Sequence, residues 1–276
     1  MVKVRFKHYR EYLDQRIVVN DTVMGLLAGS KLSEQLLSLS YGSTALLGDM
    51  YPGIQDINRF NLPVAKAREV LDDAENLLVI LAVPQILALH EDLMIDMLGI
   101  LGFSGQPSAA QMHEKFEDET GLSFPSEELA LFHLIRLARN EHIHNGGVAR
   151  AHFAQQISEL PQEAEDTWTE ITDESFPVYE AGDPVILNNA FLVGTLAVTR
   201  RLASIANKHL AQVIPVPRWA DLVVHEWSLG ERKGNKNQQW RSIRGLAKRF
   251  YAAINIPENE LEAAFERYLE DEAGNV

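Results

Sequence analysis

Helical periodicity runs through most of this chain and limits its fold to an arrangement of packed helices. Residues 65–101 carry apolar side chains at helical spacing, which predicts a helical hairpin or a kinked helix with Pro84 as the break. A second helix is expected over residues 126–144, with Ser126 as its N-cap and an Asn-Gly-Gly sequence as its left-handed exit. The 276 residues suffice for one large domain or two smaller ones. We therefore expect a mainly α-helical bundle.

The sequence also predicts a small β-hairpin, three domains and four further helices. Alternation around Gly182-Asp183 indicates a small β-hairpin insertion within residues 176–187. Three domains are expected: a loop-rich N-terminal arm (1–60), a helical domain (61–214), and a C-terminal helical appendage (215–276) that begins at a Pro-Val-Pro break. Further helices are predicted over residues 108–119, 189–210, 239–254 and 258–270.

Composition narrows the classes of function. The net charge of −14 counts against a protein that coats nucleic acid, although it leaves room for a local basic groove. The absence of cysteine excludes disulfides, a thiolate nucleophile and cysteine-ligated zinc. The longest apolar stretch, residues 77–89, is cut by Pro84, and the N-terminus lacks the apolar core of a secretory signal. We expect a cytoplasmic protein with no membrane partner.

Charge is unevenly distributed along the chain. Residues 155–183 carry nine acidic side chains and no Lys or Arg, whereas a C-terminal basic cluster lies close to Trp240 and Phe250. This cluster either binds an RNA backbone, with an aromatic ring to stack a base, or is a solvated helix face that pairs internally with the acidic tail (258–272) or with the acidic segment 155–183. Its members are Arg232, Lys233, Lys236, Arg241, Arg244, Lys248 and Arg249.

The end of the 126–144 helix has a distinctive polar order, R-N-x-x-x-H. An apolar stripe along the helix precedes the polar residues Arg139, Asn140 and His144. One helical face carries Arg136, Asn140 and His144, at positions i, i+4 and i+8. On a helical wheel Arg139 and His144 are roughly 140° apart, with Asn140 between them. A long guanidinium and a histidine at a helix end can still converge on one ligand.

These residue types suit one reaction. RNA carries its own nucleophile, the 2′-hydroxyl, and a histidine exchanges a proton near neutral pH. Arginine offers a planar, permanently charged fork for the phosphate oxygens as negative charge develops on them. The set fits transesterification to a 2′,3′-cyclic phosphate, a reaction that requires neither a metal nor a cofactor.

Structural readings of the same residues stay open. His144 also fits a solvated helix C-terminus, and Arg139 fits a surface partner of Glu141 or Glu128. His142 falls on the apolar stripe, which favours a buried or half-buried structural histidine. No His-Glu-x-x-His or similar spacing indicates a metal site.

The motif resembles the signature of the HEPN superfamily, a group of all-α domains with many metal-independent ribonucleases. Leu89-His90-Glu91-Asp92-Leu93 resembles the acidic turn of an earlier core helix in that family, and residues 195–209 resemble its closing helix. The resemblance covers about residues 64–211. It implies a catalytic pair of Arg139 and His144, with Asn140 as the supporting polar residue. Glu91 either sits in the cleft as a further supporting residue or is a structural acid.

The resemblance also carries expectations about partners. It implies a homodimer in which two such turns face each other across a cleft, and an RNA substrate. It further implies a toxin-like or phage-defence RNase restrained by an antitoxin or another regulatory partner. The alternative is a non-catalytic HEPN module that dimerises or binds a partner or a nucleotide. The presence of both Arg139 and His144 favours the nuclease, since a purely structural member has no need of them.

Overall fold

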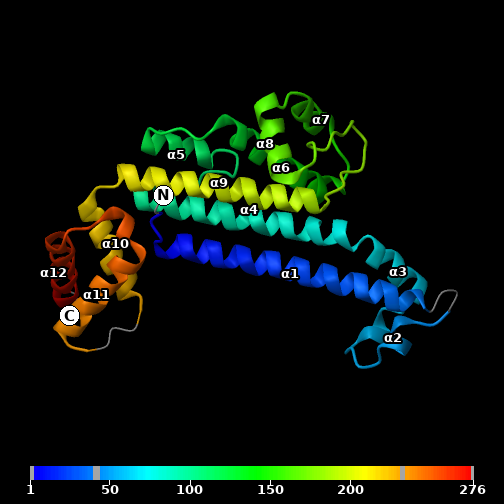
Figure 1. Ribbon diagram of the computed structural model, residues 1–276, viewed down its shortest axis with the longest axis horizontal. Coiled ribbons are helices and arrows are strands. Elements are labelled where there is room, and N and C mark those ends of the chain that lie inside the picture. Colours follow the sequence, from blue (N-terminus) through cyan, green and yellow to red (C-terminus); the bar gives the residue numbers. More distant parts are fainter. Residues whose placement is uncertain (1–2, 40–43, 231–233, 275–276) are drawn as a thin grey trace. The chain divides into compact units, whose positions relative to one another are not determined.

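The computed structural model describes residues 3–39, 44–230 and 234–274, and every regular element in these ranges is a helix (Figure 1). The predicted all-helical character is therefore confirmed. The α-helices are α1 (Lys7–Ser38), α2 (Leu47–Met50), α3 (Val64–Asp72), α4 (Ala74–Leu101), α5 (Met112–Thr120), α6 (Ser126–Asn145), α7 (Ala151–Ser158), α8 (Gln162–Thr172), α9 (Asn189–Val213), α10 (Val216–Ser228), α11 (Lys236–Phe250) and α12 (Glu258–Gly274). Two short 3₁₀ helices, η1 (Ile57–Arg59) and η2 (Ala252–Ile254), complete the set.

The chain divides into two compact units, each assembled from segments far apart in the sequence. Unit 1 comprises Met1–Gln15, Leu89–Leu129 and Thr199–Val276, and unit 2 comprises Arg16–Ala88 and Ala130–Val198. Helices α1, α4, α6 and α9 each contribute residues to both units. The three contiguous domains expected from the sequence stay a prediction.

Unit 2 has an aromatic centre that fixes how α8 meets α9. Trp168 is buried and packs edge-on against Phe176, with ring centroids 4.7 Å apart, and against Phe191 at 5.6 Å. Gly194 on α9 lies directly against the Trp168 ring, where a Cβ atom would overlap the indole. Because residue 194 has no side chain, the indole ring can pack directly against the backbone of α9.

Pro84 does not break the helix in which it lies. The predicted break falls instead at Asp73, between α3 and α4, and Pro84 is inside the 28-residue helix α4. As a result α4 is the one helix in the described ranges that is long and apolar enough to cross a membrane, with a mean hydropathy of 1.7 over an 18-residue window. Of that window 44% is buried inside the protein, and the core helix of a folded domain meets the same criteria.

The predicted β-hairpin at residues 176–187 is wrong, because no strands are present in the described part of the chain. A tight turn does form, in which the Asp183 side chain accepts the Glu180 N–H at 2.8 Å. The flanking backbone bonds elsewhere: Val185 donates to the Gly147 carbonyl at 2.8 Å and Ala149 donates to the Asp183 carbonyl at 2.9 Å. The segment thus pairs with the exit of α6 and not with itself.

The N-terminal arm is not loop-rich over residues 7–38, which form the 32-residue helix α1. The sequence conceals this helix because apolar residues lie on its exposed side as well as on its buried side, which blurs the helical pattern. Helix α10 was not predicted either. It follows directly on the Pro215 break, with Pro217 in its first turn, where a missing N–H costs nothing.

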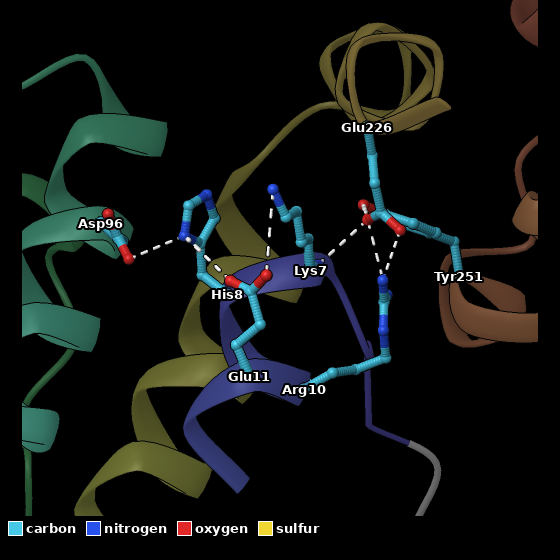
Figure 2. Close-up of polar contacts among 7 residues, drawn as sticks. All are labelled: Lys7, His8, Arg10, Glu11, Asp96, Glu226 and Tyr251. Carbon is cyan, nitrogen blue, oxygen red and sulfur yellow. Dashed lines mark hydrogen bonds and ion pairs between the residues drawn. The ribbon is translucent and has the colours of Figure 1, made fainter. Parts of the chain in front are cut away.

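In unit 1 the N-terminus of α1 is held by the buried carboxylate of Glu226 on α10 (Figure 2). This carboxylate accepts the Lys7 N–H at 3.0 Å, the Arg10 guanidinium at 2.5 Å and the Tyr251 hydroxyl at 2.7 Å. The Arg10 guanidinium also lies over the Phe250 ring, 3.9 Å from its centroid. Burial and the adjacent Glu226 carboxylate raise the pKa of Tyr251, so its hydroxyl stays a donor.

A second contact holds the same turn. Figure 2 shows His8 between Asp96 and Glu11, and its Nδ1 lies 2.8 Å from the Asp96 carboxylate. Burial raises the pKa of Asp96, and the nearby His8 opposes that shift.

Removal of the Tyr251 hydroxyl tests the Glu226 contact. Tyr251→Phe keeps the ring but deletes a hydrogen bond to a charged acceptor, and we expect the free energy of unfolding to fall by about 1.5–3 kcal/mol. Tyr179→Phe is the matched control, because the Tyr179 hydroxyl donates to a neutral carbonyl, that of Ile186, at 2.7 Å. Its loss should be smaller, about 0.5–1.5 kcal/mol. Equal effects in urea denaturation would contradict the role assigned to Glu226.

Candidate functional site

The candidate site lies in unit 2, on the last two turns of α6 and the loop that follows. One face of this helix is buried through Leu131, Ile135 and Ala138, as the apolar stripe predicted. Arg139 and Asn140 are half-buried at the edge of that face, and His144 is exposed in the final turn. The helix begins at Ser126, which is its first helical residue and not its N-cap.

Arg139 and Asn140 form a pair. The Arg139 Nη1 donates a hydrogen bond to the Asn140 Oδ1 at 3.1 Å. The Arg139 Nε is buried and has no hydrogen-bond partner within the described residues. Part of the guanidinium fork is therefore held in place while donor capacity remains unused.

The acidic residues considered as partners of Arg139 are engaged elsewhere. The Glu141 carboxylate binds the Arg150 Nε at 3.2 Å, and Glu128 lies 3.8 Å from Arg201. Burial raises the pKa of Glu128. The simple reading of Arg139 as half of a salt bridge with Glu141 or Glu128 is therefore wrong.

Glu141 is the residue that fixes the exit of α6. Its side chain is only 2% exposed and accepts the Asn145 amide at 2.6 Å in addition to the Arg150 guanidinium. Its backbone carbonyl accepts the Gly147 N–H at 3.0 Å. One buried residue thus bonds to three points downstream, and His144 lies in the turn that these bonds enclose.

The two glycines of the exit allow this closure. Gly146 and Gly147 have φ values of 63° and 79°, in the left-handed region predicted for the exit. At Gly147 a Cβ would also come within 3.1 Å of the His142 Nδ1. His142 is half-buried, as expected, and burial lowers its pKa while a backbone hydrogen bond at Val185 opposes that shift.

The structure brings together only part of the predicted set. Within the described residues no hydrogen bond joins His144 to Arg139 or Asn140. Arg136 is half-buried on the same helix, where its charge adds to burial in lowering the pKa of His133. Glu91 lies on the part of α4 that belongs to unit 1, so its supporting role stays a prediction.

The C-terminal basic cluster lies in unit 1, and two of its five described members form ion pairs. Arg232 and Lys233 fall outside the described residues. Lys236 binds Glu266 at 2.7 Å and Arg244 binds Glu258 at 3.2 Å, both across to α12. These two ion pairs are of the kind expected if the basic cluster pairs internally with the acidic tail, the alternative to RNA binding.

Arg241 and Lys248 line an open pocket of about 540 Å³ between α11 and the start of α12, together with the paired Arg244. Arg249 packs on Phe250 at 4.9 Å. The Trp240 ring stacks on Phe265 with the planes 15° apart, so this indole is already used within the protein.

Neither a metal site nor a similar protein supports a function for this chain. No group of three or more His, Asp or Glu side chains in the described ranges is arranged to hold a metal ion. Comparison of the chain with known protein families, curated proteins and solved structures gives no match. The HEPN resemblance therefore stays a prediction that rests on the residues themselves.

The sequence did not predict the contact between Glu141 and Arg150, although one signal of a buried carboxylate was present. Glu141 lies seven residues after Leu134, so a helical wheel places it beside the apolar stripe. A carboxylate at such a position needs a partner when it is buried. The identity of that partner, nine residues away beyond two glycines, follows only from the fold.

The lowered pKa of His142 predicts a pH effect on stability. Since the folded state disfavours its charged form, the unfolded chain takes up the proton first, and the free energy of unfolding falls as the pH drops below about 6.5. His142→Gln should make this dependence shallower in denaturant titrations across pH. His133 and His209, whose pKa values are also lowered by burial, should maintain the remaining slope.

Ile143→Gln is the control for a glutamine in the same turn, because Ile143 is exposed and does not titrate. Its pH dependence should match that of the unaltered protein. An unchanged slope in His142→Gln would contradict the assignment.

Proposed function

We propose that this protein is a metal-independent endoribonuclease and that the end of α6 carries its catalytic residues. The observation that carries the proposal is a half-buried arginine, held by Asn140 and free of any acidic partner in the described residues, one turn before an exposed histidine. Buried arginines are usually neutralised by a carboxylate. An anionic ligand such as a phosphate would supply that charge.

The proposed reaction uses the nucleophile that RNA itself provides. His144 takes the proton of the 2′-hydroxyl, and the 2′-oxygen attacks the adjacent phosphorus. The bond to the 5′-oxygen breaks, and that oxygen takes a proton from solvent. Arg139 hydrogen-bonds the non-bridging oxygens as their charge grows. The products are a 2′,3′-cyclic phosphate and a 5′-hydroxyl.

Asn140 and Glu141 act as positioning residues in this scheme. Asn140 orients the Arg139 fork by accepting from Nη1, and Glu141 binds the Asn145 side chain and the Gly147 N–H just beyond His144. A catalytic group must be held within a fraction of an ångström of its productive position. These contacts supply that support without touching the substrate.

Substitution of the catalytic pair tests the proposal. His144→Ala should reduce RNA cleavage roughly 100- to 10,000-fold, and Arg139→Ala roughly 100- to 1,000-fold, because each removes a group that acts in the transition state. Arg139→Lys should recover only part of the loss, since it keeps the charge and loses the fork. His152→Ala, an exposed histidine on α7, is the matched control.

Circular dichroism must show that the variants stay folded. If His144→Ala and Arg139→Ala cleave like the unaltered chain, the catalytic assignment is wrong. If the unaltered chain itself leaves RNA intact, the alternative of a non-catalytic HEPN module replaces it.

The chemistry gives a separate prediction. Cleavage should persist in EDTA and leave a 2′,3′-cyclic phosphate, and a substrate with a single 2′-deoxy sugar at the cut should resist cleavage because it lacks the nucleophile. Mass spectrometry of the fragments identifies the termini. Activity that disappears in EDTA and returns with Mg²⁺ would refute the proposed mechanism.

A further inference from the structure

The open pocket beside α11 in unit 1 combines a large volume with a positively charged wall. Its volume of about 540 Å³ falls within the range of sites that bind small molecules. One face of α11 supplies this wall, on which three basic residues and a glycine recur at the helical spacing i, i+3, i+4 and i+7: Arg241, Arg244, Gly245 and Lys248. The chain from the end of α11 to the first turn of α12 supplies the rest of the lining. The pocket is therefore built entirely within one compact unit.

The basic side chains of this wall remain available to a ligand. Within the described residues the side chains of Arg241 and Lys248 form neither an ion pair nor a hydrogen bond. Arg244 binds Glu258 through its Nε at 3.2 Å, which leaves the two Nη groups of its guanidinium as donors. Glu258 is the one carboxylate among the lining residues, so three positive charges meet one negative charge and the lining has a net charge of +2. The pocket is thus a positive site on a chain whose net charge is −14.

Most of the remaining lining is apolar. The Tyr251 hydroxyl borders the pocket but already donates to Glu226. The other lining residues include four with aliphatic side chains, Ala247, Ala252, Ile256 and Leu261. An inorganic anion such as phosphate would contact the basic wall and leave this apolar surface in water. A ligand that fills the pocket therefore needs an apolar part as well as an anionic group.

We propose that this pocket binds a small phosphate monoester that carries an apolar organic group. Such a monoester has a charge of about −1.5 to −2 at neutral pH, which matches the net +2 of the lining. The guanidinium forks of Arg241 and Arg244 suit the phosphate oxygens, and Lys248 adds a third donor group. The proposal does not depend on the ribonuclease activity, because the pocket belongs to unit 1 and residues 139–144 belong to unit 2.

Phenyl phosphate is a suitable probe, and titration calorimetry of the full chain measures its dissociation constant. Arg241→Gln and Lys248→Gln should each raise that constant roughly tenfold, because each removes a charged donor. Glu258→Gln should lower it several-fold, because it removes the one carboxylate of the lining. Lys236→Gln is the matched control, since Lys236 lies on the same helix but binds Glu266 and does not line the pocket. All four substituted side chains are exposed, so circular dichroism should stay unchanged.

The apolar part of the ligand is tested separately. Inorganic phosphate should bind at least about fivefold more weakly than phenyl phosphate, because it has no apolar surface to bury. Gly245→Leu should reduce this difference, since it fills the space beside the basic wall and leaves every charge in place. A Cβ added at Gly245 meets nothing within 4 Å, so the helix can accept the side chain.

Four results would overturn the proposal. Phenyl phosphate fails to bind saturably at millimolar concentrations, or binds no more tightly than inorganic phosphate. Glu258→Gln weakens binding, or Lys236→Gln weakens it as much as Arg241→Gln does. A DNA oligonucleotide without terminal phosphates that displaces phenyl phosphate would also contradict it, because the basic wall would then hold a nucleic-acid backbone.

Discussion

A single buried carboxylate, that of Glu141, determines the shape of the candidate site. It is almost fully buried at the end of α6. A buried carboxylate needs hydrogen-bond donors, and Asn145 and Arg150 supply them. Both partners follow it in the chain, so compensation of the charge also closes the turn. The exposed His144 therefore lies in a final helical turn that these hydrogen bonds tie to the loop beyond it. If the carboxylate were removed, the Arg150 guanidinium would lose its ion-pair partner. The loop after α6 would also lose the hydrogen bonds that connect it to the helix.

A second buried carboxylate, that of Glu226, has a similar role in unit 1. It accepts hydrogen bonds from the Lys7 N–H and the Arg10 guanidinium in the first turn of α1, and from the Tyr251 hydroxyl. In both places the arginine is neutralised and serves structure. Arg139 differs because its only side-chain hydrogen bond in the described residues is to a neutral amide. The contrast between neutralised arginines and this one supports a ligand role for Arg139 more strongly than the sequence motif alone does.

Local signals in the sequence predicted the local structure well. The exit of α6 followed from its glycines, and the end of α9 from the prolines at 215 and 217. The failures share one cause, which is that tertiary context decided the outcome. Pro84 stays inside α4, residues 176–187 pair with 147–149 and not with themselves, and exposed apolar residues concealed α1. At the end of α6, His142 is half-buried as the sequence predicted, whereas the catalytic roles of Arg139, Asn140 and His144 stay predictions. The sequence could not identify the partner of Glu141, because that contact depends on the path of the loop.

The distribution of charge constrains how such a protein could hold RNA. The chain has a net charge of −14, and Lys236 and Arg244 of the basic cluster are paired with acids on α12. Exposed pairs of this kind add little to stability, but each one reduces the positive charge that a phosphate backbone meets. Few phosphates can then be neutralised at once, so affinity for RNA should depend only weakly on salt. If the protein is the proposed ribonuclease, this charge distribution favours recognition of a short RNA segment over long-range attraction of the backbone.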